Sequence, residues 1–260
     1  MSIFFSIVIP IYKPSELLTS CIDSIECQTS ENYEVILVDY LDSISDILHG
    51  EVLNRSKVYY VSISTPGVYS AMSAGIKLAR GNWILFMGHD DLLFSPSTLA
   101  LVKNHIDKII KTPVALYGNC LINGDTGWAA NGSIYDGRFT LAKLFKANIC
   151  QQAIFYDRNS LFRVGGLDDA DGVTGDWKVN LKLSLIGELV YMPYVVSVFS
   201  AGGLSSNPCN TSGAFYPPLS YAYIYKLCRE CGLGFLRSAI LSLKIIILIF
   251  AGRTIPSLAL

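Results

Sequence analysis

Short runs of bulky apolar residues alternate along the chain with stretches in which apolar positions recur every three or four residues. Strand-like runs occupy Ile3 to Ile9, Tyr33 to Val38, Val58 to Ile63, Trp83 to Phe86 and Val114 to Tyr117. Helical spacing lies between them, over Leu17 to Ile25, Tyr69 to Ala79 and Thr98 to Ile110. This alternation predicts an α/β domain with a mostly parallel central sheet flanked by helices.

Beyond residue 117 the pattern changes. Gly118 to Arg138 is rich in Gly, Asn and Asp, which predicts loops or short hairpin strands. An amphipathic helix is expected from Asp176 onwards, with Trp177, Val179, Leu181, Leu183 and Leu185 as its apolar positions. We expect a main domain over residues 1–215 and a helical tail over 216–260, in which Leu233 to Ala251 is nearly all apolar.

The apolar tail has three interpretations. Arg237 and Lys244 lie two helical turns apart, which suits a helix in the membrane interface with basic side chains toward anionic headgroups. The tail can instead pack against the main domain. It can also span a bilayer, although a central Lys costs about 2.5 to 3.5 kcal/mol there and the segment is barely long enough. We expect the interfacial arrangement.

Composition limits the possible partners. The 260 residues carry a formal net charge of -1, so nothing attracts the chain to nucleic acid. Only 16% of the residues are charged and the mean hydropathy is +0.41, which indicates a surface that meets lipid or a partner. Seven cysteines without regular spacing, and no signal peptide, predict reduced thiols in the cytoplasm. Cys228 and Cys231 lack a second ligand pair for zinc.

Two adjacent carboxylates, Asp90 and Asp91, follow the apolar run Trp83 to Phe86 after a glycine. Ligands of open α/β sheets gather beyond the carboxyl ends of such strands. Carboxylate oxygens suit Mg²⁺ or Mn²⁺, which are typically shared with substrate phosphates. In the alternative interpretation one Asp caps a helix beginning near Ser95-Pro96 and the other faces water. Neither a Gly-x-Gly-x-x-Gly turn nor a Gly-Lys-Ser/Thr phosphate loop is found.

Several segments, in this order and spacing, resemble family 2 glycosyltransferases of the GT-A fold. They are Ser6 to Tyr12, Glu34 to Asp39, Pro66 to Ile76, Ala79 to Ile84, Gln151 to Tyr156, Gly165 to Asp168, Gly175 to Trp177 and Ala201 to Ser205. The resemblance is strongest to the branch that builds bacterial surface polysaccharides of the O-antigen, capsule or colanic-acid type. It implies an inverting transferase that moves a sugar from a nucleotide sugar, expected to be a UDP-sugar, to a hydroxyl.

The resemblance also implies roles for residues on the donor side. Pro10 and Tyr12 correspond to the turn that contacts the nucleotide, and Asp39 to the carboxylate that reads the base. Asp91 corresponds to the direct ligand of Mg²⁺ or Mn²⁺, with Asp90 near the ribose or sharing the ion. From the residues alone, Asp39 can also be a solvated turn aspartate after a strand.

On the acceptor side, Asp176 is the expected general base. A carboxylate acting near neutral pH needs a raised pKa, from burial or from neighbouring carboxylates such as Asp168, Asp169 and Asp171. Asp176 can alternatively, or also, cap the helix that follows it. Sugar hydroxyls and rings are expected to meet Gln151, Gln152, Trp177 and Trp128, although such aromatic residues are more often part of a core.

The resemblance further implies a lipid-linked saccharide acceptor and a location peripheral on the inner, cytoplasmic face of the cell membrane. The alternative is a catalytically weak relative that binds nucleotide sugar or scaffolds an assembly complex. It is motivated by Ser70 and Ser73, where the family usually has Asp and Asn. A phosphotransferase with an aspartate pair is disfavoured, because no nucleophilic Asp ends the first strand.

Overall fold

The computed structural model describes residues 3–44, 50–52, 54–203 and 220–250. The strands are β1 (Phe5–Ile11), β2 (Tyr33–Tyr40), β3 (Val58–Ile63), β4 (Trp83–Phe86), β5 (Leu92–Leu93), β6 (Ala115–Asn123), β7 (Ile134–Tyr135), β8 (Ile154–Asp157) and β9 (Leu189–Ser200). The helices are α1 (Leu17–Glu26), α3 (Val68–Leu78), α4 (Thr98–Ile106), α5 (Leu141–Leu144), α6 (Arg158–Arg163), α7 (Gly175–Ile186), α9 (Tyr221–Glu230) and α10 (Phe235–Phe250). Two 3₁₀ turns, η1 (Gln151–Ala153) and η2 (Asp169–Thr174), complete the list.

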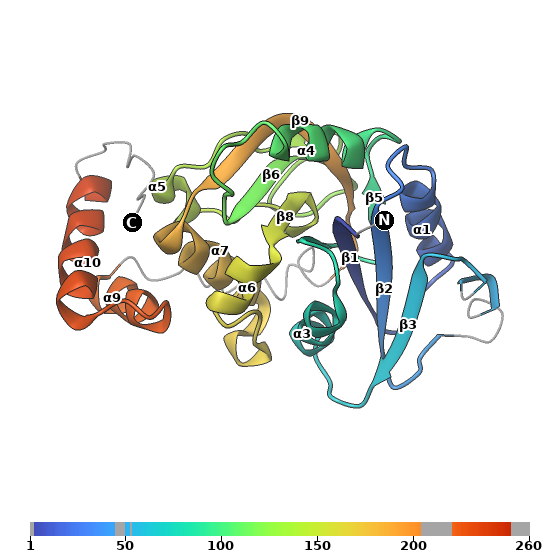
Figure 1. The fold of residues 1–260 in the computed structure, drawn as a ribbon, viewed down its shortest axis with the longest axis horizontal. Helices are drawn as coiled ribbons and strands as arrows, with labels where there is room; N and C mark the ends of the chain where they lie inside the picture. Colours follow the sequence, from blue (N-terminus) through green and yellow to red (C-terminus); the bar gives the residue numbers. More distant parts are fainter. Residues whose placement is uncertain (1–2, 45–49, 53, 204–219, 251–260) are drawn as a thin grey trace.

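The strands form one curled sheet in the order β3-β2-β1-β4-β8-β6-β9-β5, with β7 paired to β6 (Figure 1). β3, β2, β1 and β4 are parallel, as the alternating pattern predicts. β8 enters antiparallel between β4 and β6, and β9 runs parallel to β6. The sheet is therefore mixed, and the predicted parallel arrangement holds only for its first half and for the β6 and β9 pair.

The sequence pattern located the first half of the sheet well. Helix α1 buries Leu18, Cys21, Ile22 and Ile25, the positions whose spacing predicted it. β1 and β2 are buried on both faces, because one set of alternate residues packs on the side of α1 and the other on the side of α3. Helix α4 ends at Ile106, earlier than predicted. β8 and β9 were not predicted from the apolar runs.

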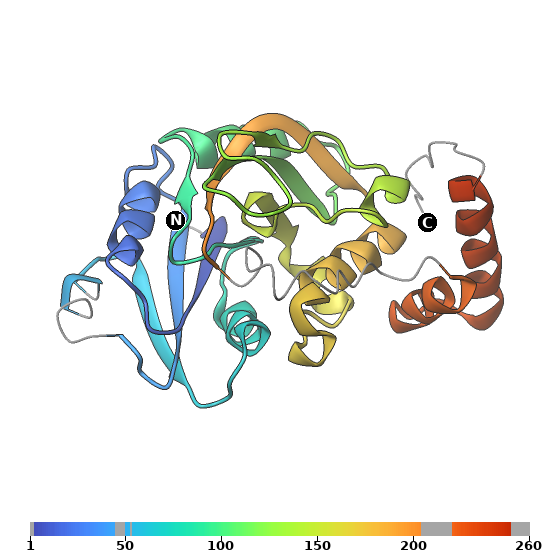
Figure 2. The ribbon, with the colours of Figure 1, turned by 180° about the vertical axis from the view of Figure 1, so that it is seen from behind.

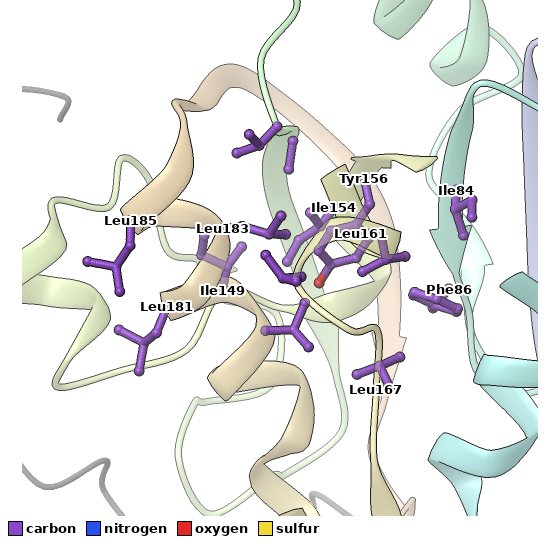
Figure 3. Close-up of a cluster of buried hydrophobic side chains, with 14 of the residues drawn as sticks. Ile84, Phe86, Ile149, Ile154, Tyr156, Leu161, Leu167, Leu181, Leu183 and Leu185 are labelled. Carbon is purple, nitrogen blue, oxygen red and sulfur yellow. The ribbon is translucent and has the colours of Figure 1, made fainter. Parts of the chain in front are cut away.

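Helix α7 lies inside the molecule rather than on its surface. Five consecutive residues, 179–183, are buried, so the prediction of an amphipathic helix is wrong. The physical reason is that α7 packs against four other elements, α5, α6, η2 and α9. Figure 3 shows Leu183 of α7 beside the side chains of β8 and α6, with Ile84 and Phe86 of β4 on the far side of Tyr156 and Leu161.

The C-terminal helices α9 and α10 lie at the end of the molecule opposite β3 (Figures 1 and 2). Ile224, Leu227, Leu241 and Ile245 are fully or almost fully buried and belong to the same core as α7. Within the described residues no helix combines the length and apolar character needed to cross a bilayer. The expected tail begins at residue 216, and its first residues, 216–219, lie outside the described ones.

Candidate active site

Two strands, β2 and β4, deliver carboxylates to one edge of the sheet, on either side of β1. Asp39 is paired in register with Ile11 at the carboxyl end of β1 and β2. The backbone of Met87, directly after β4, donates to Val8 O of β1, so the Asp90 and Asp91 turn starts beside the same edge. Carboxyl ends of neighbouring parallel strands meet in this way, which is where ligands of open α/β sheets bind.

Asp39 is fully buried. Its carboxylate accepts hydrogen bonds from Ser43 Oγ at 2.5 Å, the Ile44 backbone N at 3.0 Å and Tyr60 Oη at 2.8 Å. Burial, together with hydrogen bonds to Asp42 and Asp39, raises the pKa of Tyr60 far above its usual value. The alternative of a solvated turn aspartate is therefore wrong, because the chain folds back over Asp39 after the strand.

Asp91 is also buried, and protein groups surround its carboxylate. Oδ1 accepts from the Ser200 backbone N at 3.0 Å, and Oδ2 accepts from the Gly88 backbone N at 3.0 Å and Gln152 Nε2 at 2.9 Å. Burial raises the pKa of Asp91 to about 7, although these hydrogen bonds oppose the rise. Three of about four acceptor positions of a carboxylate are thus occupied, which leaves one for a ligand.

Asp90 is the more accessible carboxylate of the pair, since it is only partly buried. A Cβ added to Gly88 would lie 2.7 Å from Asp90 Oδ1 and 2.8 Å from Asp91 Oδ2, so both carboxylates approach this glycine. Neither aspartate caps the following helix: Ser97 is the N-cap of α4. The helix-cap alternative is wrong, because the turn carries the pair back toward the sheet instead.

The pair has the chemistry of a site for a divalent cation shared with a substrate. No cluster of three or more His, Cys, Asp or Glu suited to a metal is found among the described residues. Mg²⁺ is commonly held by one or two carboxylates and completed by phosphates and water, so two carboxylates fit such an ion. Asp90 and the free acceptor position of Asp91 are the residues that would hold it.

Asp176 occupies the first turn of α7, and Thr174 is the N-cap of that helix. The N-cap alternative for Asp176 is therefore wrong by two positions. Asp176 Oδ1 accepts from Tyr69 Oη at 3.2 Å and Oδ2 accepts from Asn148 Nδ2 at 2.7 Å. Burial raises the pKa of Asp176 to about 6, which brings it close to the range of a useful general base.

The neighbouring acidic residues do not contribute to that pKa as the sequence suggested. Asp171 pairs with Lys178 at 2.8 Å, and Asp168 accepts from the Ala170 backbone N at 2.9 Å. Asp169 accepts from the backbone N of Tyr69 and of Ser70, at 3.0 and 2.7 Å, at the start of α3. Burial is thus the cause of the raised pKa, and the acidic cluster has structural partners of its own.

One short segment, residues 148–152, joins the two halves of the site. Asn148 donates to Asp176 and Gln152 donates to Asp91. Between them, the pKa of the Cys150 thiol is raised by its hydrogen bond with Cys120, by burial and by the charges of both Asp91 and Asp176. The expected general base and the expected metal ligand therefore lie on either side of one segment.

Two residues that the sequence did not single out, Asn148 and Tyr69, hold Asp176 in place, and the Tyr69 hydroxyl also accepts from the Asp176 backbone N at 3.3 Å. Asp169, which the sequence suggested only as a neighbouring carboxylate, anchors Tyr69 at the start of α3. Gly67, at φ 117°, allows this because a Cβ there would lie 2.3 Å from the Asp169 carboxylate. The segment Pro66 to Ile76 was the available signal, since it belongs to the motifs that carried the resemblance.

The remaining predicted residues are placed as follows. Pro10 lies in β1, and exposed Tyr12 follows it with its ring 5.6 Å from that of Tyr40. Gln151 Nε2 approaches Met72 Sδ at 3.6 Å, and Trp177 Nε1 donates to Leu144 O at 2.5 Å. Gln152 is buried and committed to Asp91, so its amide supports that carboxylate.

Trp128 is linked to Asp91 through two residues at the end of β9. Its ring is 5.4 Å from that of Phe199, which immediately precedes Ser200, a donor to Asp91. It also packs 5.0 Å from Tyr135 and is more than a third exposed. Trp128 thus presents a partly exposed aromatic surface beside the strand end that supplies Ser200.

Comparison with known proteins assigns this arrangement. The model for "Glycosyl transferase family 2" matches residues 6–160, which is more than half of the chain and includes Asp39, Asp90 and Asp91. The chain belongs to this family. It is therefore a glycosyltransferase, and its mixed α/β architecture is that of the GT-A fold.

A relative and two solved structures illustrate the match. The chain is 36% identical over 209 residues to the PGL/p-HBAD biosynthesis glycosyltransferase of Mycobacterium bovis, covering 78% of this chain and 79% of that protein. It superposes with a TM-score of 0.64 and 16% identity on S. aureus TarS 1–349 in complex with UDP-GlcNAc, over 97% and 74% of the two chains. With the mannosyltransferase PcManGT from Pyrobaculum calidifontis in complex with GDP-Man and Mn²⁺, the TM-score is 0.61 at 17% identity, over 97% and 75%.

Proposed function

We propose that this family 2 glycosyltransferase inverts the anomeric centre of a nucleotide sugar, using Asp176 as general base. The observation that carries the proposal is the placement of Asp176. Its carboxylate is held by Tyr69 and Asn148, has a pKa of about 6, and lies across residues 148–152 from Asp91. A carboxylate poised in this way can take a proton from an alcohol near neutral pH.

In the proposed reaction the acceptor hydroxyl oxygen attacks the anomeric carbon from the face opposite the leaving group. Its proton passes to an oxygen of Asp176 as the new C–O bond forms. The bond between the anomeric carbon and the diphosphate oxygen breaks, and the nucleoside diphosphate leaves with that electron pair. A single displacement of this kind inverts the configuration. A double displacement would need a second carboxylate as nucleophile, whereas this single displacement needs only a base.

Mg²⁺ or Mn²⁺ is the proposed cofactor, held by Asp90 and Asp91. When bound, such an ion neutralises charge on the leaving diphosphate. Gln152, Gly88 and Ser200 fix the Asp91 carboxylate, so the site is preorganised by the protein. Mn²⁺ in the PcManGT complex supports this part of the proposal by analogy.

A UDP-sugar is the proposed donor. Asp39 is proposed to accept a hydrogen bond from the base, with Pro10 and Tyr12 contacting the nucleotide. The buried carboxylate at the end of β2 supports this role, because Ser43, Ile44 and Tyr60 fix its position by hydrogen bonds. The TarS fragment in complex with UDP-GlcNAc supports the choice of uridine, at the level of the shared fold.

The proposed acceptor is a hydroxyl of a lipid-linked saccharide in surface-polysaccharide synthesis, at the inner face of the cell membrane. Trp128 supports a saccharide, since a partly exposed aromatic ring packed on Phe199, next to the Asp91 donor Ser200, offers an apolar face to a pyranose. Gln151 and Trp177 stay as proposed acceptor contacts.

The rival proposal is a catalytically weak scaffold, motivated by Ser70 and Ser73. Both serines have structural partners: Ser70 Oγ binds the Asp169 carboxylate, and Ser73 Oγ donates to Leu167 O at 2.7 Å. They tie α3 to the segment before α7, which holds the general base. Their presence therefore fits a working enzyme as well as a scaffold, and the rival loses its motivation.

Calorimetric titration of the protein with UDP, GDP and CDP, each with and without Mn²⁺, tests the proposal. We expect Mn²⁺-dependent binding of UDP alone, weakened at least about tenfold in Asp90→Asn, the loss of one charged ligand. Glu188→Gln, at an exposed residue just before β9 and thus at the opposite end of that strand from Ser200, is the matched control and should bind as the wild type does. No binding of any nucleotide would sink the catalytic proposal, and GDP or CDP binding would overturn the donor assignment.

A further inference from the structure

Helix α10 buries only one of its faces. Ser238, Leu241, Ser242 and Ile245 are buried against α9, where Ser242 Oγ lies 3.9 Å from Cys228 Sγ. On the opposite side are five large apolar side chains, each more than half exposed: Leu236, Ile240, Leu243, Ile247 and Phe250. A helix that is apolar on all sides is normally covered on all sides.

These five residues form a continuous stripe. Their spacing of four, three, four and three residues keeps them within about 80° of one another around a helix of 3.6 residues per turn. The helix has 16 residues, or roughly 24 Å at 1.5 Å per residue, which is shorter than the hydrocarbon core of a bilayer. The stripe therefore suits a helix that lies along a surface and does not cross it.

Charge around the stripe is of one sign. Arg237 and Lys244 are exposed and share one flank of the stripe, roughly 90° from its centre. Among residues 220–250 the sole acidic residue is Glu230, and it is turned inward to Lys182 at 2.7 Å and Lys178 at 3.5 Å. The outer side of α10 thus presents apolar side chains beside cations, with no carboxylate to repel an anionic surface.

Aromatic side chains gather where α9 meets α10. The rings of Tyr221 and Tyr225 stack at 6.0 Å, and the ring of Tyr225 meets that of exposed Phe235 edge-on at 5.9 Å. Tyrosine combines an apolar ring with a polar tip and is enriched at the boundary between lipid and water. The cluster supplies such an anchor at the first turn of α10.

From these observations we infer that the exposed stripe of α10 docks on the surface of an anionic lipid bilayer. The five apolar side chains enter the acyl boundary, and Arg237 and Lys244 bind the headgroups. The inference rests on the proposed function in one respect: docking is useful to the enzyme because it brings a lipid-linked acceptor to the active site. Figures 1 and 2 show α10 at one end of the molecule, where a surface can reach it without covering the carboxyl edge of β1, β2 and β4.

Vesicle flotation of the full chain tests this inference. The probe is vesicles of phosphatidylcholine with phosphatidylglycerol, compared with phosphatidylcholine alone. Wild-type protein should float with the anionic vesicles. Leu243→Glu combined with Ile247→Glu should reduce partitioning more than about tenfold, because two apolar anchors are lost. Ile110→Glu, at a fully exposed apolar residue after α4, is the matched control and should float as the wild type does.

Charge is tested separately. Arg237→Gln with Lys244→Gln should weaken binding to anionic vesicles by about thirtyfold, since each basic residue near such a surface contributes roughly fivefold. Lys108→Gln with Lys111→Gln removes two exposed charges elsewhere and should change little. These substitutions are all exposed, and an unchanged circular dichroism spectrum and UDP affinity would show that the fold and the nucleotide site are intact.

Three results would overturn the inference. The wild type could stay unbound to anionic vesicles, as it would if residues 251–260 covered the stripe. It could dimerise in sedimentation, with the dimer abolished by Leu243→Glu and Ile247→Glu, which would assign the stripe to a second copy of the chain. The control and stripe variants could float equally. Because UDP titration does not depend on vesicles, a failure here leaves the proposed function standing, and the reverse also holds.

Discussion

Asp176 owes its chemistry to its surroundings more than to its own residue type. Aspartate has an ordinary pKa of 3.8, and burial raises that of Asp176 to about 6 while Tyr69 and Asn148 hold the carboxylate by hydrogen bonds. The same hydrogen bonds lower the pKa, so burial is the larger effect. The balance keeps the group ionised at neutral pH yet basic enough to take a proton.

Replacing Asp176 by Asn should remove the base and leave the nucleotide site intact. We expect kcat to fall by about 10²- to 10⁴-fold with little change in the affinity for UDP. The wild-type rate should fall as the pH drops below about 6, since protonated Asp176 cannot accept a proton. A pH profile of kcat for both proteins checks this. A variant that keeps its rate, or its acidic limb, would show that another group is the base.

Tyr69→Phe should also affect Asp176, because it removes one of the two side-chain hydrogen bonds to that carboxylate. The tyrosine hydroxyl donates to Asp176 Oδ1 and lowers its pKa, so its loss should move the acidic limb of the profile to higher pH. We expect a fall in kcat of about tenfold, comparable to one hydrogen bond to a charged group. Tyr194→Phe changes an exposed tyrosine elsewhere and serves as control. If the two variants have the same limb, Tyr69 does not tune the base.

At the scale of elements, the active site depends on hydrogen bonds that a distant segment accepts from the N-terminus of α3. The N-cap of α3 is Gly67, which has no side chain to offer. Asp169, about a hundred residues later in η2, accepts from the backbone N of Tyr69 and Ser70 in its place. This contact fixes the entry of α3, and with it the Tyr69 hydroxyl, against the first turn of α7.

Asp169→Ala should therefore lower both stability and activity. Loss of a helix cap costs about 1–2 kcal/mol, and a displaced Tyr69 should reduce kcat as Tyr69→Phe does. Asp168→Ala, which removes only the bond to the Ala170 backbone N at 2.9 Å, is the neighbouring control. Urea unfolding and steady-state rates measure the two effects. Equal losses in both variants would mean that the acidic segment acts only as a local turn.

At the scale of the whole molecule, the last two helices, α9 and α10, are attached to the core through α7. Lys182 of α7 is nearly buried and pairs with Glu230 of α9 at 2.7 Å, while Leu227 and Ile245 extend the core outward. Burial raises the pKa of Glu230, but hydrogen bonds and charges of Lys182 and Lys178 lower it below its usual value on balance. The described part of the tail, 220–250, is thus packed on the main domain on one side and exposed on the other.

Glu230→Ala should loosen this attachment. The loss is expected to be about 1.5–3 kcal/mol, since Lys182 keeps its buried charge without its partner. Because the folded pKa of Glu230 is lowered, the contribution is present above its unfolded pKa and is lost as the pH falls through the folded value. Lys226→Ala, which removes a weak contact at 3.9 Å, should cost at most about 0.5 kcal/mol. Thermal melts at neutral and acidic pH distinguish them; a pH-independent difference contradicts the ion-pair account.

The sequence by itself determined the local features. Apolar runs and helical spacing gave β1 to β4, α1 and α3, because strands buried on both faces and helices buried on one face leave a periodic record. The motifs, through their resemblance, indicated the family and the carboxylates Asp39, Asp90, Asp91 and Asp176. Those residues lie at the end of a strand, in the turn after one or in the first turn of a helix, so their neighbours along the chain define them.

Only the tertiary structure decided what the carboxylates can do. Asp91 is held by Gly88, Gln152 and Ser200, and Asp176 by Tyr69 and Asn148; all of these partners except Gly88 come from distant parts of the chain. The sequence of α7 predicts an amphipathic helix, yet residues 179–183 are all buried. The helix α9, which covers part of α7, is remote in sequence, so the local pattern could not show this burial. Burial and long-range hydrogen bonds set the pKa values, and neither leaves a periodic pattern along the chain. For that reason the chemistry of the site became visible only in the fold.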